Sequence, residues 1–480
     1  MNKQFASNAL LIVVLNLLVK SFYLFGIDRT VQNILPEGEY GLYFTLFNFA
    51  FLFQIISDFG LQNYNARHLA SSRQLLSKYF PYLLGLKLVL GLIFVFTVVI
   101  SGYAWGFQNT MVWWLLAGIA INQLLQSLVL FLRSNLAGLG LYRLDSFASV
   151  LDKTFLVIIA SVLLWTPGLR SHFELYWFVL AHSAAYLMTI IILYSLLKPK
   201  LIRPRIRLEW AKIAYFLKAS APFALVIFLM TAYTRLDAIM IEKLLPDGLV
   251  QVDRYASAFR LLDAANVAGF LLAGLLLPMF ARQLKEKENI NPLVKLAIST
   301  MWLGAISLAI AIYAFAAPVM HALYVDANVD SVTIVRWLML TFIPMSGAYV
   351  YGTLLTANGN LKRMNIIFAI SIVLNIALNL YLIPIHGASG AAFATFTTQS
   401  MAFIAQLFLA HHLLDLKFDK RLWIRFGLYA SGLILAVFIM ETQLSSSLLI
   451  VKFISLVSVG IILAFALKLL DVKSWMKIGG

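Results

Sequence analysis

Apolar residues recur along this chain in long stretches that are separated by short polar connections. A helix that crosses the hydrocarbon core of a bilayer needs about 20 mostly apolar residues. At that length, the pattern predicts about fourteen membrane-spanning helices. They cover residues 8–33, 40–61, 80–102, 111–132, 149–166, 175–196, 213–240, 255–280, 294–317, 334–356, 364–384, 388–411, 423–440 and 448–468.

The composition supports the same class of protein. Of the 480 residues, 62% are hydrophobic and only 12% are charged, whereas an ordinary soluble domain has about 25% charged residues. So few charged residues cannot cover the surface of a soluble protein of this length, so a soluble enzyme is excluded. Disordered chains are poor in aromatic residues, but 14% of this chain is aromatic. We therefore expect an all-α integral membrane protein.

The net charge of +16 is distributed along the chain as an orientation signal. Lysine and arginine gather in every second connection between the predicted spans. Both ends of the chain are also basic and would lie on the same side of the membrane as these connections. Cytoplasmic loops of membrane proteins carry such an excess of basic residues. We therefore expect an even number of spans and both termini in the cytoplasm. Because orientation accounts for the basic residues, we expect no nucleic-acid partner.

The longest basic connection covers 198–212 and contains Lys198-Pro199-Lys200 and Arg203-Pro204-Arg205. Its prolines prevent a continuous helix, so we expect a cytoplasmic linker. The linker divides the first twelve spans into two sets of six, as in many two-lobed transporters. The expected parts are a first lobe at 1–197, the linker, a second lobe at 213–412, and two further helices with the C-terminus at 413–480.

Charged residues inside the predicted spans are the candidate functional groups. An ionisable side chain at the bilayer centre costs roughly 2.5–3.5 kcal/mol, so it usually faces a cavity or a partner. An excess of cations in a low-dielectric cavity suits a phosphate or pyrophosphate group. Structural ion pairs and, near helix ends, snorkelling side chains are the alternatives. The cations are Lys20, Arg29, Lys87, Arg235 and Arg260, and the acids are Asp28, Asp237 and Asp263.

Sequence motifs of common enzymes are missing. The chain has no Gly-x-x-x-x-Gly-Lys-Ser/Thr, Gly-x-Gly-x-x-Gly, His-Glu-x-x-His or Gly-x-Ser-x-Gly motif. It has no cysteine either, which excludes disulfides and thiolate metal sites. Glu37 and Glu39 in an outer connection leave a membrane glycosyltransferase or polymerase as an alternative, although no large outer domain accompanies them. We expect a protein that is not an enzyme and holds neither metal nor cofactor.

Three sets of short segments carry a family resemblance. They are NILPEGEYGLY (33–43) with SDFGL (57–61); RLD (235–237) with YASAFRL (255–261) and LP (277–278); and LLTANGN (354–360) with NIALNL (375–380), IP (383–384) and GASGAA (387–392). In this order they resemble polysaccharide (O-antigen type) flippases of the multidrug/oligosaccharidyl-lipid/polysaccharide (MOP) exporter superfamily. The resemblance covers most of the first 412 residues.

The resemblance implies two six-helix lobes arranged in a V and transport by alternating access. It implies a flippase that moves a polyprenyl-pyrophosphate-linked oligosaccharide from the cytoplasmic to the outer leaflet of the bacterial inner membrane. Basic residues in the first and eighth helices of such flippases contact the pyrophosphate, which points to Arg29 and Arg260. The partners implied are this glycan, membrane lipid and other membrane proteins of polysaccharide assembly.

The remaining candidates complete one hypothesis. Lys20, Lys87 and Arg235 would line the same cationic cavity. The acids Asp28, Asp237 and Asp263 would orient the cations or couple transport to a Na⁺ or H⁺ gradient. A cation-coupled multidrug exporter of the same superfamily is the main alternative, and it would need a cavity dominated by acids.

Overall fold

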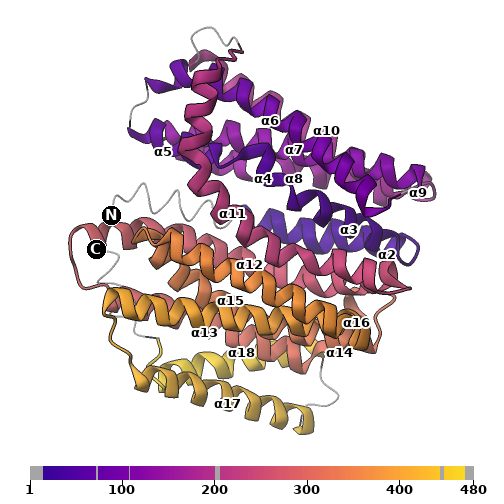
Figure 1. The fold of residues 1–480 in the computed structure, drawn as a ribbon. Coiled ribbons are helices and arrows are strands. Elements are labelled where there is room, and N and C mark those ends of the chain that lie inside the picture. The colour runs from indigo at the N-terminus through magenta and orange to yellow at the C-terminus, as the bar shows by residue number, and fades with distance from the viewer. Residues whose placement is uncertain (1–14, 72–73, 108, 201–205, 444–447, 471–480) are drawn as a thin grey trace. The chain divides into compact units, whose positions relative to one another are not determined.

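The computed structural model describes residues 15–71, 74–107, 109–200, 206–443 and 448–470. Regular structure in these ranges is helical throughout (Figure 1). Ten of the described helices are long and apolar enough to cross a membrane, or eleven when one bent pair counts as a span. This confirms the all-α membrane class, while the count of fourteen spans stays a prediction. Contacts group the chain into two compact units, 2–253 and 254–480.

The first unit is built from helices that pack pairwise around a shared interior. Helix α10 packs on α7 and α8, α11 packs on α3 and α5, and α4 packs on α6. The bounds are η1 (a π-helix, Tyr23–Asp28), α2 (Arg29–Ile34), α3 (Glu39–Leu52), α4 (Gln54–Asp58), α5 (Leu61–Ser71), α6 (Leu75–Trp105), α7 (Thr110–Gly138), α8 (Tyr142–Trp165), α9 (Pro167–Arg170), α10 (Leu175–Leu197), η2 (3₁₀, Lys198–Lys200) and α11 (Trp210–Leu244).

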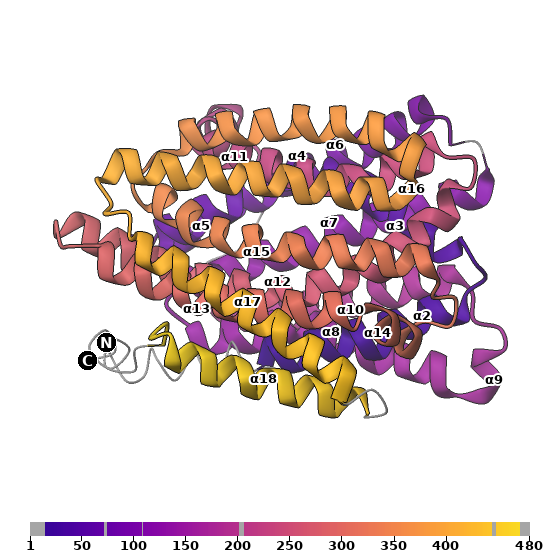
Figure 2. The same ribbon diagram turned by 90° about the horizontal axis from the view of Figure 1, so that it is seen from below.

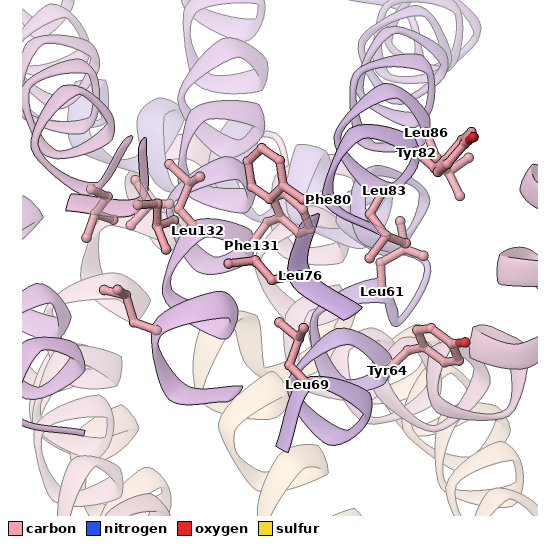
Figure 3. Packing of buried hydrophobic residues seen from close by; sticks show 14 of the residues in the cluster. Leu61, Tyr64, Leu69, Leu76, Phe80, Tyr82, Leu83, Leu86, Phe131 and Leu132 are labelled. Atoms are coloured by element: carbon pink, nitrogen blue, oxygen red, sulfur yellow. The ribbon is translucent and has the colours of Figure 1, made fainter. Parts of the chain in front are cut away.

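One end of this unit has a dense apolar cluster in which α5, α6 and α7 meet (Figure 3). Phe80 of α6 and Phe131 of α7 stack with ring centroids 5.7 Å apart, and both side chains are buried. Tyr64 of α5 packs edge-on against Phe216 of α11, at 5.7 Å. Aromatic pairs in these geometries stabilise a fold beyond the area they bury. The cluster therefore holds α11 against the helices that precede the linker.

The second unit continues from Arg254, within α12. Helix α15 packs on α13 and α16, and α17 packs on α18 and α13 (Figure 2). Proline lies inside α12 and α15 without ending either helix. The bounds are α12 (Gly248–Lys285), α13 (Asn291–Ala314), α14 (Ala316–Leu323), α15 (Val329–Ala357), α16 (Leu361–Leu414), α17 (Lys420–Gln443) and α18 (Leu449–Ala466).

Helix α16 is two helices that meet without a loop. Its 54 residues would reach about 80 Å as one straight helix, far more than the roughly 30 Å of a bilayer core. Gly387 breaks it with φ 61° and ψ −147°, a conformation that a residue with a side chain rarely adopts. At Gly390 a Cβ would collide with the carbonyl oxygen of Leu382. The small residues at 387–392 therefore make a tight reversal, where Figure 2 shows α16 turning back.

The connection between α2 and α3 docks on the start of α12 inside the first unit. Asp253 accepts hydrogen bonds from the side chain of Gln32 and from the backbone N–H of Gly38, the latter at 3.0 Å. Gly38 has φ 87°, which favours glycine. A Cβ on Gly41 would collide with the backbone oxygen of Leu249. This docking explains the two glycines of the NILPEGEYGLY segment.

The end of the linker lies along α6. The backbone N–H of Arg207 donates to the carbonyl of Pro81 at 3.1 Å. The Tyr82 hydroxyl donates to Glu209 Oε1 at 2.7 Å and accepts from Lys212, which also pairs with Glu209 at 2.8 Å. Residues 206–209 are therefore held at a defined place, whereas the predicted linker residues 201–205 lie outside the described part. The predicted boundaries at 197, 212 and 412 stay predictions.

Acidification should release this docked segment. Hydrogen bonds from Lys212 and Tyr82 lower the pKa of Glu209, so the contact is complete above the ordinary glutamate pKa of about 4.3 and is lost as the pH falls through the lowered value. Hydrogen-exchange protection at the Arg207 amide should fall over that interval. In Tyr82→Phe, which keeps the ring, protection should already be weaker at neutral pH. Wild-type protection that stays constant on acidification would contradict this.

A methyl group at Gly41 should destabilise the protein. Overpacking against a backbone atom costs about 1–3 kcal/mol, so Gly41→Ala should lower the thermal unfolding midpoint of the detergent-purified protein. Gly427→Ala is the matched control, because Gly427 is also helical but has nothing within 4 Å of an added Cβ. Gly427→Ala should leave the midpoint unchanged or raise it, because replacing a glycine by alanine within a helix increases the free energy of unfolding by up to about 1 kcal/mol. Equal midpoints for the two variants would show that the contact between Gly41 and the backbone of Leu249 can widen to accept a methyl group.

Candidate functional site

The first described helix changes from α-helical to π-helical geometry in the turn that ends at Asp28. Residues 15–22 are α-helical, Tyr23–Asp28 form the π-helix η1, and α2 continues from Arg29. Inside the widened turn, the Thr30 hydroxyl donates to the carbonyl of Gly26 at 2.6 Å. π-helical turns are rare and occur frequently at functional sites. The irregular backbone therefore lies at two of the candidate residues from the sequence, Asp28 and Arg29.

Asp28 lies in a pocket of tyrosines. Its side chain is buried, and the Tyr40 hydroxyl donates to the carboxylate from 2.9 Å. The Tyr23 hydroxyl reaches the same carboxylate at 3.5 Å. Hydroxyl donors orient a buried carboxylate and stabilise it. Arg29, the next residue, is half-buried.

Tyr23 also belongs to a second polar group inside the unit. The Lys153 ammonium lies 4.5 Å from the ring centre of Tyr23 and 5.8 Å from that of Tyr186, and aromatic faces attract cations. His182 packs edge-on against Tyr23, with ring centroids 6.2 Å apart. Its Nδ1 lies 3.0 Å from the carbonyl oxygen of Phe178. The sequence did not reveal His182, because a single histidine in an apolar stretch has no characteristic spacing.

Lys20 lies just before the π-helix and faces α8. The Asn16 side chain on the same helix donates to Ser149 Oγ at 2.9 Å, which ties this helix to α8. Asp152 and Lys153 on α8 and Arg133 on α7 act on Lys20 electrostatically. The structure therefore places Lys20 near charged side chains of both α7 and α8.

Arg235 is held by α3. Its Nη1 lies 3.3 Å from Asn48 Oδ1, and the guanidinium carbon lies 5.0 Å from the ring centre of Phe51. An amide oxygen and an aromatic ring orient a guanidinium. Asp237 is deeply buried while Arg235 is half-buried, as expected for residues two apart, which do not share a helix face.

Lys87 forms an ion pair in the interior of the first unit. Its side chain on α6 is fully buried, and the ammonium donates to Asp58 at the end of α4. The second oxygen of Asp58 lies 3.4 Å from the backbone N of Gln62. Between α4 and α5, Phe59 and Gly60 have φ values of 48° and 75°. The pair therefore fastens this break in the helix to α6, a role that the sequence alone did not assign to Asp58.

The remaining candidates lie on α12 in the second unit. Arg260 is buried, donates to the Tyr324 hydroxyl at 2.7 Å, and has its guanidinium carbon 5.6 Å from that ring centre. Arg254, also on α12, pairs with Asp330 of α15 at 3.1 Å. Asp263 is half-buried. A neutral hydroxyl thus orients Arg260 much as Asn48 orients Arg235.

The acidic segment at Glu37 and Glu39 borders a cavity of about 520 Å³ within the first unit. Glu242 and Asp247 line it as well. Within the described ranges, no three histidine, aspartate or glutamate side chains are grouped so that they could hold a metal ion.

The geometry shows how three of the candidate cations are oriented. The Lys87 ammonium donates to Asp58, Arg235 lies against Asn48, and Arg260 donates to the Tyr324 hydroxyl. Guanidinium groups oriented in this way suit the binding of phosphate oxygens. The carboxylate of Asp28 accepts hydrogen bonds from the hydroxyls of Tyr40 and Tyr23.

Removing one partner of the Lys87–Asp58 pair should strongly destabilise the first unit. An uncompensated buried charge costs about 3–5 kcal/mol, so Lys87→Met should lower the unfolding midpoint markedly. Adding Asp58→Asn should restore much of that loss, and the four proteins form a double-mutant cycle. If the pair only fastens the helices, the double variant should be close to the wild-type protein in stability. A double variant as unstable as Lys87→Met would contradict this role.

Comparison with known proteins shows the fold and the family. Lipid II flippase MurJ in an inward closed conformation superposes with a TM-score of 0.66 at 14% identity, over 96% of this chain and 98% of that one. An inward-facing multidrug resistance MATE family transporter of the MOP superfamily gives 0.62 at 14% identity, over 84% and 98%. A MOP superfamily transporter from Pyrococcus furiosus gives 0.61 at 13% identity, over 85% and 95%. No curated protein matches the chain.

The sequence itself matches a family described as "Polysaccharide biosynthesis protein" over residues 6–284. That range covers more than half of the chain, including η1, the Lys87–Asp58 pair, Arg235 and Arg260. The resemblance stated from the three sets of segments is thereby confirmed. The chain belongs to the polysaccharide biosynthesis protein family and has the fold of MOP-superfamily flippases and transporters.

Proposed function

We propose that this protein flips a polyprenyl-pyrophosphate-linked oligosaccharide from the cytoplasmic to the outer leaflet of the bacterial inner membrane, by alternating access. The observation that carries the proposal is the family match over residues 6–284 in a chain that has the fold of a lipid flippase. A flippase for a lipid-linked sugar is the function that joins polysaccharide biosynthesis to this fold. Both termini lie in the cytoplasm, and the protein transports its substrate without transforming it.

The guanidinium groups of Arg235 and Arg260 bind the pyrophosphate in this proposal. Asn48 and Tyr324 contact them through their oxygens, and these contacts orient each guanidinium. Charge-assisted hydrogen bonds to phosphate are about twice as strong as neutral ones. Arg29 and Lys20 add positive charge from the first helix. Binding by Lys87 requires its pair with Asp58 to open.

Asp28 couples the cycle to a gradient of Na⁺ or H⁺. It lies at the end of the π-helix and is held by Tyr40 and Tyr23. Binding of a cation would change the hydrogen bonds between the first helix and α3, and would favour one conformation over the other. Asp237 and Asp263 orient neighbouring cations.

Flipping in proteoliposomes tests the function and the site together. A fluorescent polyprenyl-pyrophosphate disaccharide that moves to the outer leaflet becomes accessible to a membrane-impermeant quencher. The loss of one charged hydrogen bond, about 1.5–3 kcal/mol, should slow flipping by Arg235→Gln about 10- to 100-fold. Arg282→Gln removes the same charge from an exposed residue of α12 that pairs with Glu286, and should flip normally.

A cation-coupled drug exporter is the second candidate, favoured by the likeness to MATE transporters. It predicts uptake of lipophilic cations that is lost in Asp28→Asn and unaffected in Arg235→Gln. Transport of such cations without flipping of the pyrophosphate lipid would overturn the proposal. Transfer of sugar by the purified protein would equally overturn it, in favour of a glycosyltransferase.

A further inference from the structure

The second unit contains a basic cavity of about 660 Å³ at one end of its helices. The start of α13, the connection from α16 to α17, the first turns of α17 and the residues that follow α18 build its walls. The sequence predicts that this end lies at the cytoplasmic surface. The charged side chains that line it are Lys295, Lys417, Asp419, Arg425 and Lys468.

The wall between α13 and α17 is held by specific contacts. Lys295 Nζ lies 2.7 Å from Asp419 Oδ2, and the other oxygen of Asp419 accepts from the backbone N–H of Leu422 at 3.2 Å, which caps α17. The backbone N–H of Lys417 donates to Asn291 Oδ1 at 3.0 Å. The hydrogen bond from Lys295 lowers the pKa of Asp419, which is therefore ionised and already paired at neutral pH.

The charge of the cavity is unbalanced as a result. Among the described lining residues, Asp419 alone carries a carboxylate, and this carboxylate is paired with Lys295. Lys417, Arg425 and Lys468 therefore bring positive charge to one cavity that its own lining does not offset. Such a group favours an anion with several oxygen acceptors, and phosphate fits this description.

The surroundings favour a phosphate that belongs to a lipid. Trp423 lines the cavity and stacks on Phe418, with ring centroids 6.0 Å apart, and aromatic residues of this kind lie at membrane interfaces. Next to Arg425, the apolar side chains of Ile424 and Leu428 are 61% and 55% exposed on α17. An acyl chain can follow these side chains while the head group stays in the cavity.

We propose that this cavity binds the phosphate of an anionic membrane lipid through Lys417, Arg425 and Lys468. The bound head group bridges α17, the segment after α18 and the start of α13, and so fastens the last two helices to the unit. Basic pockets between helices at the cytoplasmic side of membrane proteins bind lipid head groups in the same way. The site is separate from the intramembrane cations assigned to the transported substrate.

The test compares two double variants of the full-length protein. Lys417→Gln with Arg425→Gln removes two cations that line the cavity. Lys420→Gln with Arg421→Gln removes the same two charges from exposed residues of the same segment that do not line it. Native mass spectrometry measures binding of phosphatidylglycerol, with phosphatidylcholine and inorganic phosphate as the other probes. Each basic residue contributes about 1 kcal/mol, so phosphatidylglycerol should bind about 30-fold more weakly to the cavity variant and unchanged to the control.

A second measurement uses the wild-type protein and needs no variant to fold. A photoreactive phosphatidylglycerol in vesicles should label the peptide that contains Trp423 and Arg425. Equal losses in the two double variants would show general attraction to surface charge and overturn the proposal. Inorganic phosphate that displaces phosphatidylglycerol at similar concentrations would overturn the lipid as the source of the phosphate. Labelling that spares this peptide would overturn the site itself.

Discussion

A charge inside a bilayer needs a partner, because the hydrocarbon offers it no water. The described interior satisfies this constraint in more than one way. Lys87 is held by a carboxylate, and Asp28 is held by tyrosine hydroxyls. Arg235 and Arg260 are oriented by an amide and a phenol, each beside an aromatic ring. Each of these contacts joins two helices or a helix and a neighbouring segment, so the partner of a charge also fixes the packing around it.

The same constraint governs the backbone. A membrane helix can be interrupted only where the polar groups that become free are satisfied inside the protein. The break after α4 is capped by Asp58, and the π-helical turn is joined by the Thr30 hydroxyl. The reversal at Gly387 has no room for a side chain at Gly390. Each irregularity therefore lies beside a specific side chain or requires a specific glycine.

The irregular turns also place the candidate groups. Asp28 closes η1, and Arg29 begins the regular helix that follows. A π-helical turn rotates the residues beyond it relative to those before it. Asp28 lies at the end of this turn, where it accepts a hydrogen bond from Tyr40 of α3. A transporter that alternates between conformations can use such a turn, since small changes in winding move one end of a helix relative to the other.

The sequence by itself determined the class of the molecule, because the length of an apolar stretch, the alternation of basic loops and the order of short motifs are all local properties. It also singled out the charged residues within the predicted spans, among them Arg235 and Arg260. Only the tertiary structure decided the partner of each charge, since Lys87 and Asp58, or Arg235 and Asn48, are distant in the chain and meet through helix packing. For the same reason His182, Asp253 and the basic cavity at α17 had no signal in the sequence. Composition predicts that a buried charge needs a partner, but only packing selects which one.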